Sequence, residues 1–399
     1  MCLPMTDAEA ARSLLSAGAV RERAHEMLAI ALDGGLSDWR VDLDRLPATA
    51  DIVAGVIRDQ YPTLRVPFHA RWRHFVVGGR DLWAEMAATA DWADAKAKAR
   101  AAFDLAITSV LLDAGAGPSW CFLDGPTCTE TRRSEGLGVA SLRLFQSGAL
   151  SAGDDPLRAD GLTDLTAATL ADAFQVSEVN PLIGLEGRAA LLRRLGKTVG
   201  RPGDLFDRIA ARAINSRLPA PIILEVLLEA LGPIWENRLT LGGVPLGDTW
   251  RHPAIKRDDA TDGLVPIHKL SQWLAYSLIE PLEEAGIKVF GLDGLTGLAE
   301  YRNGGLFIDD GVLVLKDPAD MARTHAVGDP LVVGWRSLTV ALLDRIAPLV
   351  RERLGVAEAN FPLARVLEGG TWAAGRVLAK ERREGGGPPL TITSDGTVF

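Results

Sequence analysis

Apolar residues recur at helical spacing along most of the chain, and this pattern predicts a mainly helical protein. The first helical segment runs from Asp7 to Leu32. Thr6 or Asp7 can cap its start, because a short polar side chain accepts a hydrogen bond from the first free backbone N–H groups. Similar patterns predict further helices at 48–59, 81–113, 136–150, 164–174, 186–196, 203–214, 220–231, 268–285, 334–353 and 370–383. Helix should therefore exceed half of the residues.

Strand-like alternation of β-branched and aromatic residues is confined to short pieces between turn residues. These pieces lie at 237–250, 312–316 and 389–399, and they predict small β-hairpins on a helical body. The sequence contains neither a long Pro/Gly/Ser linker nor an internal repeat. We therefore predict a single domain over residues 1–399, with a β-hairpin excursion at about 235–262.

Composition and charge narrow the class of partner. The chain has 399 residues, of which 47% are hydrophobic and 24% charged, so a packed globular fold is expected. A net charge of −9 without a basic tail argues against nucleic acid or an anionic membrane and favours a small-molecule partner. The acidic N-terminus and the lack of an apolar run of ~18 residues predict a cytoplasmic protein. The oligomeric state stays open.

The three cysteines, Cys2, Cys121 and Cys128, are too few for a disulfide framework in a chain of this length. Cys121 and Cys128 also lack the CxxC pairing and the nearby histidines that are typical of a zinc site. We therefore expect neither a metal nor another cofactor.

The segment from Val265 to Lys316 contains most of the candidate chemistry. It begins with a predicted helix on which His268, Lys269 and Gln272 lie within one turn, so at least two of them can share a face. Such a cluster of donors can hold a phosphate or a sugar hydroxyl. The alternative is a solvated amphipathic helix whose apolar residues face inward.

Further along, LTGLAEYRNGG places Glu300, Tyr301 and Arg302 in consecutive positions, between an apolar run and two glycines. This context favours a buried or cleft-lining position. Glu300 is then a candidate general base or oxocarbenium stabiliser, and Arg302 can pair with it or bind substrate. A Glu–Arg pair that only pins a loop fits the residues equally well.

Several segments resemble known families. Three of them, HKLSQWLAYSLIEP, LTGLAEYRNGG and DDGVLVLK, are similar to stretches of the queuosine 5′-phosphate N-glycosidases, whose motifs read approximately YKRAQ, FADYR and LGVL. A closer resemblance, over almost the whole chain, is to the family of the fungal and bacterial uracil-catabolism (URC) pathway. It rests on FHARWRHF, RRSEGLGVASLRLFQSGALS, GLAEYRNGGLFIDDGVL and the terminal PLTITSDGTVF.

This resemblance implies a helical fold similar to DNA glycosylases and an active site that cleaves the C1′–N bond of a ribosyl compound. Glu300 takes the place of the FADYR aspartate and is one methylene longer, while Tyr301 and Arg302 are retained. Lys269 falls on the lysine of YKRAQ, which lies near the sugar phosphate in that family, and His268 replaces its tyrosine.

The resemblance also implies the substrate class. NGG replaces VPQ of the distant family and no aromatic-rich base platform is evident, so a bulky deazapurine is not expected. The URC pathway leaves a ribosylurea species, which predicts an N-ribosyl hydrolase that releases urea from ribosylurea or its 5′-phosphate. The alternatives are a non-catalytic binding or scaffold protein of the pathway and an N-glycosidase for another nucleoside or nucleotide.

Cleavage of a ribosidic C–N bond builds positive charge on C1′ and O4′, which a carboxylate at Glu300 would stabilise. A second group must protonate the departing nitrogen. The candidates are Asp113, Glu135 and His74. Asp113 can instead only cap a turn, and Glu135 can instead be a charge at a helix N-terminus.

The segment FHARWRHF concentrates donors and aromatic rings, including His69, Arg71, Arg73 and His74. Together with the family resemblance, this density favours contact between Arg71 or Arg73 and the substrate, because arginine clamps phosphate and stacks on rings. The competing interpretation is a surface turn that leads into a helix.

Overall fold

The computed structural model describes residues 5–393. Helix makes up 55% of the structure, so the prediction of a mainly helical protein is confirmed. Each sheet among the described residues has two strands, in agreement with the prediction of small β elements. The likeness to DNA glycosylases stays a prediction. Among residues 5–393, no helix combines the length and the apolar character needed to span a lipid bilayer.

The described chain forms two compact units. Unit 1 contains residues 5–69, 238–272 and 291–393, and unit 2 contains residues 70–237 and 273–290. Each unit is assembled from separated stretches, so no single cut in the sequence divides them. One crossing point lies inside helix α11 (Lys269–Ser277), after Gln272. The predicted single domain with its excursion at about 235–262 stays a prediction.

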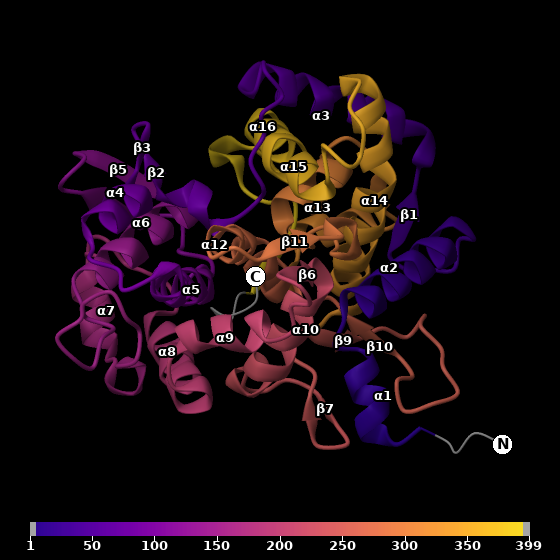
Figure 1. Cartoon of the computed structure of the whole chain (residues 1–399). Coiled ribbons are helices and arrows are strands. Elements are labelled where there is room, and N and C mark those ends of the chain that lie inside the picture. The colour runs from indigo at the N-terminus through magenta and orange to yellow at the C-terminus, as the bar shows by residue number, and fades with distance from the viewer. Residues whose placement is uncertain (1–4, 394–399) are drawn as a thin grey trace. The chain divides into compact units, whose positions relative to one another are not determined.

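Unit 1 is built around α14 (Pro330–Leu354), which is buried along most of its length and packs against α2, α3 and α13 (Figure 1). Pro330 at its first turn and Gly355 in the left-handed conformation, with φ 69°, mark its two ends. The other helices of this unit are α1 (Asp7–Ser13), α2 (Ala17–Leu32), α3 (Leu46–Gln60), α13 (Tyr301–Asp309), α15 (Leu363–Val366) and α16 (Trp372–Arg382), with a π-helix at Leu367–Thr371 between the last two.

Side-chain caps explain where the first helices begin. The prediction that Thr6 caps the first helix is confirmed, since Thr6 and Glu9 form a capping box. The predicted helix over 7–32 is nevertheless two helices. Ser16 has an extended backbone, and its side chain accepts a hydrogen bond from Ala19, so a second helix starts there.

Some strands of unit 1 pair inside a predicted segment, and others pair with a strand outside it. The hairpin expected within 237–250 is present as β7 (Thr240–Leu241) and β8 (Val244–Pro245), which pair antiparallel. β9 (Thr249–Arg251) pairs antiparallel with β10 (Leu264–Pro266). The strand expected at 312–316 is β12 (Leu313–Leu315), but it pairs with the distant β1 (Trp39–Val41) and forms no hairpin.

At the C-terminus, β14 (Thr391–Thr393) pairs parallel with β13 (Thr324–Ala326). The predicted strand pair of the tail extends to 399, and residues 394–399 lie outside the described part of the chain.

Unit 2 is built around α5 (Ala95–Leu111), which is buried over its last two thirds and packs against α6, α8, α9 and α12 (Figure 1). The predicted helix over 81–113 is two helices, because Asp94 caps a new start by accepting a hydrogen bond from Ala97. The remaining helices are α4 (Leu82–Thr89), α6 (Arg133–Gln146), α7 (Ala167–Ala173), α8 (Leu185–Val199), α9 (Leu205–Ala210), α10 (Ala220–Leu231) and α12 (Ile279–Glu284).

The strands of unit 2 are short and were not predicted from the sequence. Two antiparallel hairpins are formed by β2 (Val76–Val77) with β3 (Arg80–Asp81) and by β4 (Cys121–Asp124) with β5 (Thr129–Arg132). The third pair, β6 (Arg217–Pro219) and β11 (Lys288–Phe290), is parallel.

Candidate functional site

Glu300 is the N-cap residue of α13. Its backbone is extended, and its two carboxylate oxygens accept hydrogen bonds from the helix's own N–H groups: Oε2 from Arg302 at 2.7 Å and Oε1 from Asn303 at 2.5 Å. The positive end of the helix dipole favours a negative charge at this place. The side chain of Arg302 donates to the carbonyl of Gly386 and lies 4.8 Å from the centre of the Tyr301 ring. The Glu300 side chain is therefore fixed by capping.

The Glu300 carboxylate is half-buried, and its surroundings change its affinity for a proton. Burial raises its pKa, while the N–H groups of Arg302 and Asn303 and then the charges of Lys269 and His69 act in the opposite direction. The net effect is a pKa above the ordinary value. A carboxylate held by fixed backbone dipoles in partly buried surroundings is suited to stabilising positive charge on a ligand.

Lys269 and Gln272 lie at the start of α11, which Asp248 holds. The carboxylate of Asp248 accepts the backbone N–H of Lys269 at 2.9 Å and forms a two-point ion pair with Arg336 at 2.9 and 2.8 Å. Gln272 is fully buried and accepts an N–H from Thr296 at 3.4 Å, and its Nε2 has no hydrogen-bond partner among residues 5–393. Lys269 is half-buried and contributes a charge near Glu300.

His268 is a buried residue of the unit 1 core. It has a positive φ of 49°, and its Nε2 lies 3.0 Å from the carbonyl oxygen of Leu14. Burial lowers its pKa, so the neutral ring is favoured. These contacts account for a structural role, and substrate binding by His268 stays a prediction.

A second pair of titratable side chains lies in the same unit, and the sequence reasoning did not select it. His69 Nδ1 lies 2.6 Å from Glu368 Oε2, and both side chains are largely buried. His69 belongs to the FHARWRHF segment, whereas Glu368 lies on the π-helix, in the run LEGGT. The two adjacent glycines are the only sequence signal at Glu368, and they do not identify the partner.

Unit 2 contains a separate cluster around Arg71, which is fully buried in the 3-10 turn Arg71–Phe75. Its Nε donates to Ser109 at 2.6 Å, its Nη1 lies 3.1 Å from Asp113 Oδ2, and its guanidinium lies 5.3 Å from the centre of the Trp273 ring. Burial lowers the pKa of Arg71, while Asp113 and Glu135 raise it. Nη2 has no hydrogen-bond partner within the described residues.

The structure places the other predicted residues of unit 2 around Arg71 or beside it. His74 Nδ1 lies 3.2 Å from Arg71 Nη1, and Asp113 accepts the hydroxyl of Ser134 at 2.5 Å. These contacts give Asp113 the place of a counterion. Glu135 lies in the first turn of α6, which agrees with the alternative that it is a charge at a helix N-terminus. Arg73 forms an ion pair with Glu280. The unpartnered Nη2 supports ligand binding by Arg71, and binding or catalysis by this set stays a prediction.

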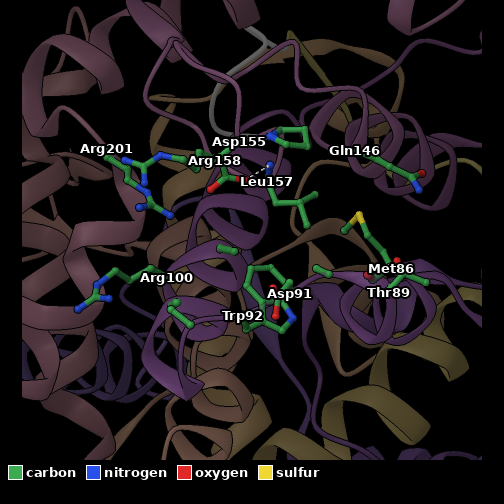
Figure 2. A pocket seen from close by; sticks show the side chains of 15 residues that line it. Met86, Thr89, Asp91, Trp92, Arg100, Gln146, Asp155, Leu157, Arg158 and Arg201 are labelled. Carbon is green, nitrogen blue, oxygen red and sulfur yellow. Dashed lines mark hydrogen bonds between the residues drawn. The ribbon is translucent and has the colours of Figure 1, made fainter.

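A cavity of about 580 Å³ lies in unit 2, away from the Arg71 cluster in sequence. Figure 2 shows Arg100, Arg158 and Arg201 on one side of it and Met86 on the other, with Trp92 below. Each of these arginines is paired with an aspartate outside the lining, namely Asp207, Asp160 and Asp104. Asp91 and Asp155 also line the cavity. Its three arginines are therefore already neutralised by ion pairs, which leaves no free positive charge among its described lining residues for an anionic ligand.

Two cysteines of the described chain lie in or next to the β4–β5 hairpin. Cys121 is half-buried and Cys128 is exposed. Among residues 5–393, no group of three or more His, Cys, Asp or Glu side chains is arranged to hold a metal ion.

Comparison with known proteins gives a family and two relatives. Residues 13–399 match the family described as "Protein of unknown function (DUF1688)". The chain is 40% identical over 407 residues to Protein urg3 of Schizosaccharomyces pombe, covering 98% of this chain and 99% of that protein. It is 37% identical over 418 residues to Uracil catabolism protein 4 of Lachancea kluyveri, covering 92% and 93% of the two. The predicted resemblance to uracil-catabolism proteins is confirmed.

Proposed function

The chain belongs to the DUF1688 family, and from this premise we propose that it is an enzyme of uracil catabolism that hydrolyses an N-ribosidic bond. The proposed substrate is ribosylurea or its 5′-phosphate, and the products are urea and ribose or its phosphate. Support for the pathway comes from a relative named Uracil catabolism protein 4, which matches this chain over nearly the full length of both.

The observation that carries the proposed chemistry is how the Glu300 carboxylate is held and what surrounds it. Two backbone N–H groups fix its carboxylate, Lys269 and His69 contribute charge nearby, and the side chain is half-buried. The surface that remains exposed leaves room for contact with a ligand. A carboxylate in this setting needs no reorganisation when positive charge develops on a sugar ring, and this is the condition for strong electrostatic catalysis.

In the proposed reaction the C1′–N bond breaks and its electron pair leaves with the urea nitrogen. Positive charge spreads over C1′ and O4′, where Glu300 stabilises it. A water oxygen then forms the new bond to C1′ and gives a proton to the Glu300 carboxylate, while the departing nitrogen receives a proton from a second group.

The test is to incubate the purified full chain with ribosylurea and with its 5′-phosphate and to measure free urea. Glu300→Gln should lower kcat on the order of a thousandfold, because several kcal/mol of transition-state stabilisation are lost with the charge. It should also lower stability by about 1 kcal/mol, because the amide is a poorer helix cap.

Asp81→Asn is the matched control, since Asp81 caps α4 through Ala84 in the same way but has no part in the proposed reaction. It should lower stability slightly and leave turnover unchanged. Full turnover in a folded Glu300→Gln variant would remove Glu300 from the mechanism. No urea from either substrate with the wild-type chain would reject the proposed activity, and a binding or scaffold role would then take its place.

A further inference from the structure

A π-helix lies beside Glu300 in unit 1. It spans Leu367–Thr371 and joins α15 to α16. Its two glycines allow close packing on α3 and on the segment after it: a Cβ on Gly370 would lie 2.8 Å from Val53 Cγ1, and one on Gly369 would lie 2.9 Å from Val66 Cγ1. π-turns are rare and frequently occur at functional sites. The widened turn is therefore held in place by its neighbours.

The π-helix presents two side chains toward the Glu300 region. Thr371 donates its hydroxyl to Asn303 Oδ1 at 2.8 Å, and the N–H of Asn303 binds Glu300. Glu368 binds His69 Nδ1 at 2.6 Å, and the backbone N–H of His69 donates to Ala364 at the start of the same helical run. One structural element thus holds both the Glu300 cap and His69.

The π-helix links His69 to the Glu300 cap, since Glu368 binds His69 while Thr371 binds Asn303, whose N–H binds Glu300. The charge of His69 is also among the influences that lower the Glu300 pKa. An imidazole bound to a carboxylate through Nδ1 has a fixed orientation and tautomer, with Nε2 as the nitrogen that exchanges protons. The other histidine of this region, His268, is directed to the carbonyl of Leu14 instead.

We propose that His69, oriented by Glu368, is the general acid that protonates the departing nitrogen. This inference rests on the proposed N-ribosyl hydrolase activity. A urea anion is too basic to leave unaided, so the C1′–N bond breaks as the proton on His69 Nε2 moves to that nitrogen. Urea departs neutral, His69 is left neutral, and water supplies the hydroxyl on C1′ and the proton that Glu300 accepts. Proton exchange with solvent then restores both residues.

The experiment compares two leaving groups. The leaving nitrogen of ribosylurea needs a proton. A ribosyl fluoride instead releases fluoride as the anion without a proton, and fluoride is small enough to take the place of urea. His69→Asn should lower urea release from ribosylurea by ~10²–10⁴-fold, the usual contribution of a general acid. It should lower fluoride release less than about tenfold. Glu300→Gln should lower both reactions on the order of a thousandfold, because both build positive charge on C1′.

Glu368→Gln tests the orienting carboxylate and remains informative if His69→Asn does not fold. It should slow urea release on the order of tenfold and leave fluoride release nearly unchanged. His25→Asn is the matched control, since His25 binds Asp344 at 3.0 Å in the same unit, and it should change neither reaction.

Equal losses on the two substrates for either variant of the His69–Glu368 pair would overturn the proposal and assign the pair to folding. In that outcome, urea release by the wild-type chain and by Glu300→Gln still tests the proposed function separately. A wild-type chain that releases urea from neither ribosylurea nor its phosphate would reject the hydrolase activity and the general acid together.

Discussion

At the scale of single residues, Glu300 combines a structural and a proposed chemical role in one carboxylate. Its sequence context pointed to a buried or cleft-lining position, and the structure places it half-buried at a helix N-terminus. Sequence alone could not separate a cap from a catalytic group, because both need an anion next to free N–H groups. The contacts of the Arg302 side chain are to the carbonyl of Gly386 and the ring of Tyr301.

The raised pKa of Glu300 predicts an acid limb in the rate profile. Burial raises this pKa, so the carboxylate takes up a proton at a higher pH than an ordinary glutamate near ~4.3. The protonated form carries no charge for the transition state. Activity should therefore fall as pH falls through a midpoint above that value, and kcat/KM for urea release measured from pH 4 to 8 checks it.

Lys269→Met should move this midpoint further up, because the Lys269 charge lowers the pKa of Glu300. Lys380→Met, at an exposed position of α16, should leave it in place. A midpoint that moves down in Lys269→Met would contradict the assignment of the limb to Glu300.

Other residues of the region could not be assigned from spacing alone. The helical pattern correctly put Lys269 and Gln272 on one helix. The prediction was wrong for His268, which precedes that helix with a positive φ and turns to the carbonyl of Leu14, 254 residues away in sequence. His69 and Glu368 are likewise separated by 299 residues. Contacts over such distances depend on the packing of helices, which local periodicity does not encode.

At the scale of elements, the sequence predicted most helices but not all of their ends. Ser16 and Asp94 each divide a predicted helix, because a side-chain cap inside an apolar pattern starts a new helix without disturbing the pattern. The strand at 312–316 was also predicted, yet its partner β1 was not. Strand pairing is set by the faces that become buried, so a lone strand pattern leaves the partner open.

The packing of α16 on α13 gives a prediction at this scale. A Cβ on Gly375 would overlap the carbonyl oxygen of Arg302, so the two helices touch at a glycine. Gly375→Ala should destabilise the fold by about 3 kcal/mol, because backbone must move to admit the methyl group. It should also lower turnover, since α13 carries Glu300 at its start. Guanidinium unfolding and urea release measure the two effects.

Gly55→Ala is the control within a helix of the same unit, because a Cβ at Gly55 meets nothing within 4 Å. It should raise stability by roughly 0.5–1 kcal/mol through helix propensity. If the two substitutions changed the free energy of unfolding equally, α16 would not pack closely on the backbone of α13 at Gly375.

At the scale of the whole molecule, composition predicted a packed protein but not its division into two units. Each unit draws on separated stretches of sequence, and no compositional shift marks the points where the chain passes between them. Buried charged groups are spread over both units, with Arg336, the partner of Asp248, in unit 1 and Asp104 in unit 2. The pH dependence of global stability therefore reports on the entire chain.

Asp248 and Asp104 act on stability in opposite directions. Burial alone would raise the pKa of Asp248, but the charge and hydrogen bonds of Arg336 hold it well below the ordinary range. Its stabilisation is present above ~3.9 and is lost as pH falls. Burial raises the pKa of Asp104 to about 7, against the opposing influence of Arg201. The folded chain keeps that proton where the unfolded chain has released it, so stability falls as pH rises from about 4 to about 7 and this contribution levels off above 7.

The free energy of unfolding should accordingly be highest near pH 4, fall as pH drops below it, and fall as pH rises from about 4 to 7. Asp104→Asn cannot ionise, so it should flatten the decline between about pH 4 and 7. It should also lower the free energy of unfolding by about 1–3 kcal/mol, because the amide NH₂ group cannot accept a hydrogen bond from Arg201 Nε or Gly203 N–H. Asp59→Asn, at an exposed position of α3, should keep the wild-type profile. Guanidinium unfolding at several pH values measures all three, and an Asp104→Asn curve parallel to that of the wild type would show that Asp104 does not hold a proton in the folded chain.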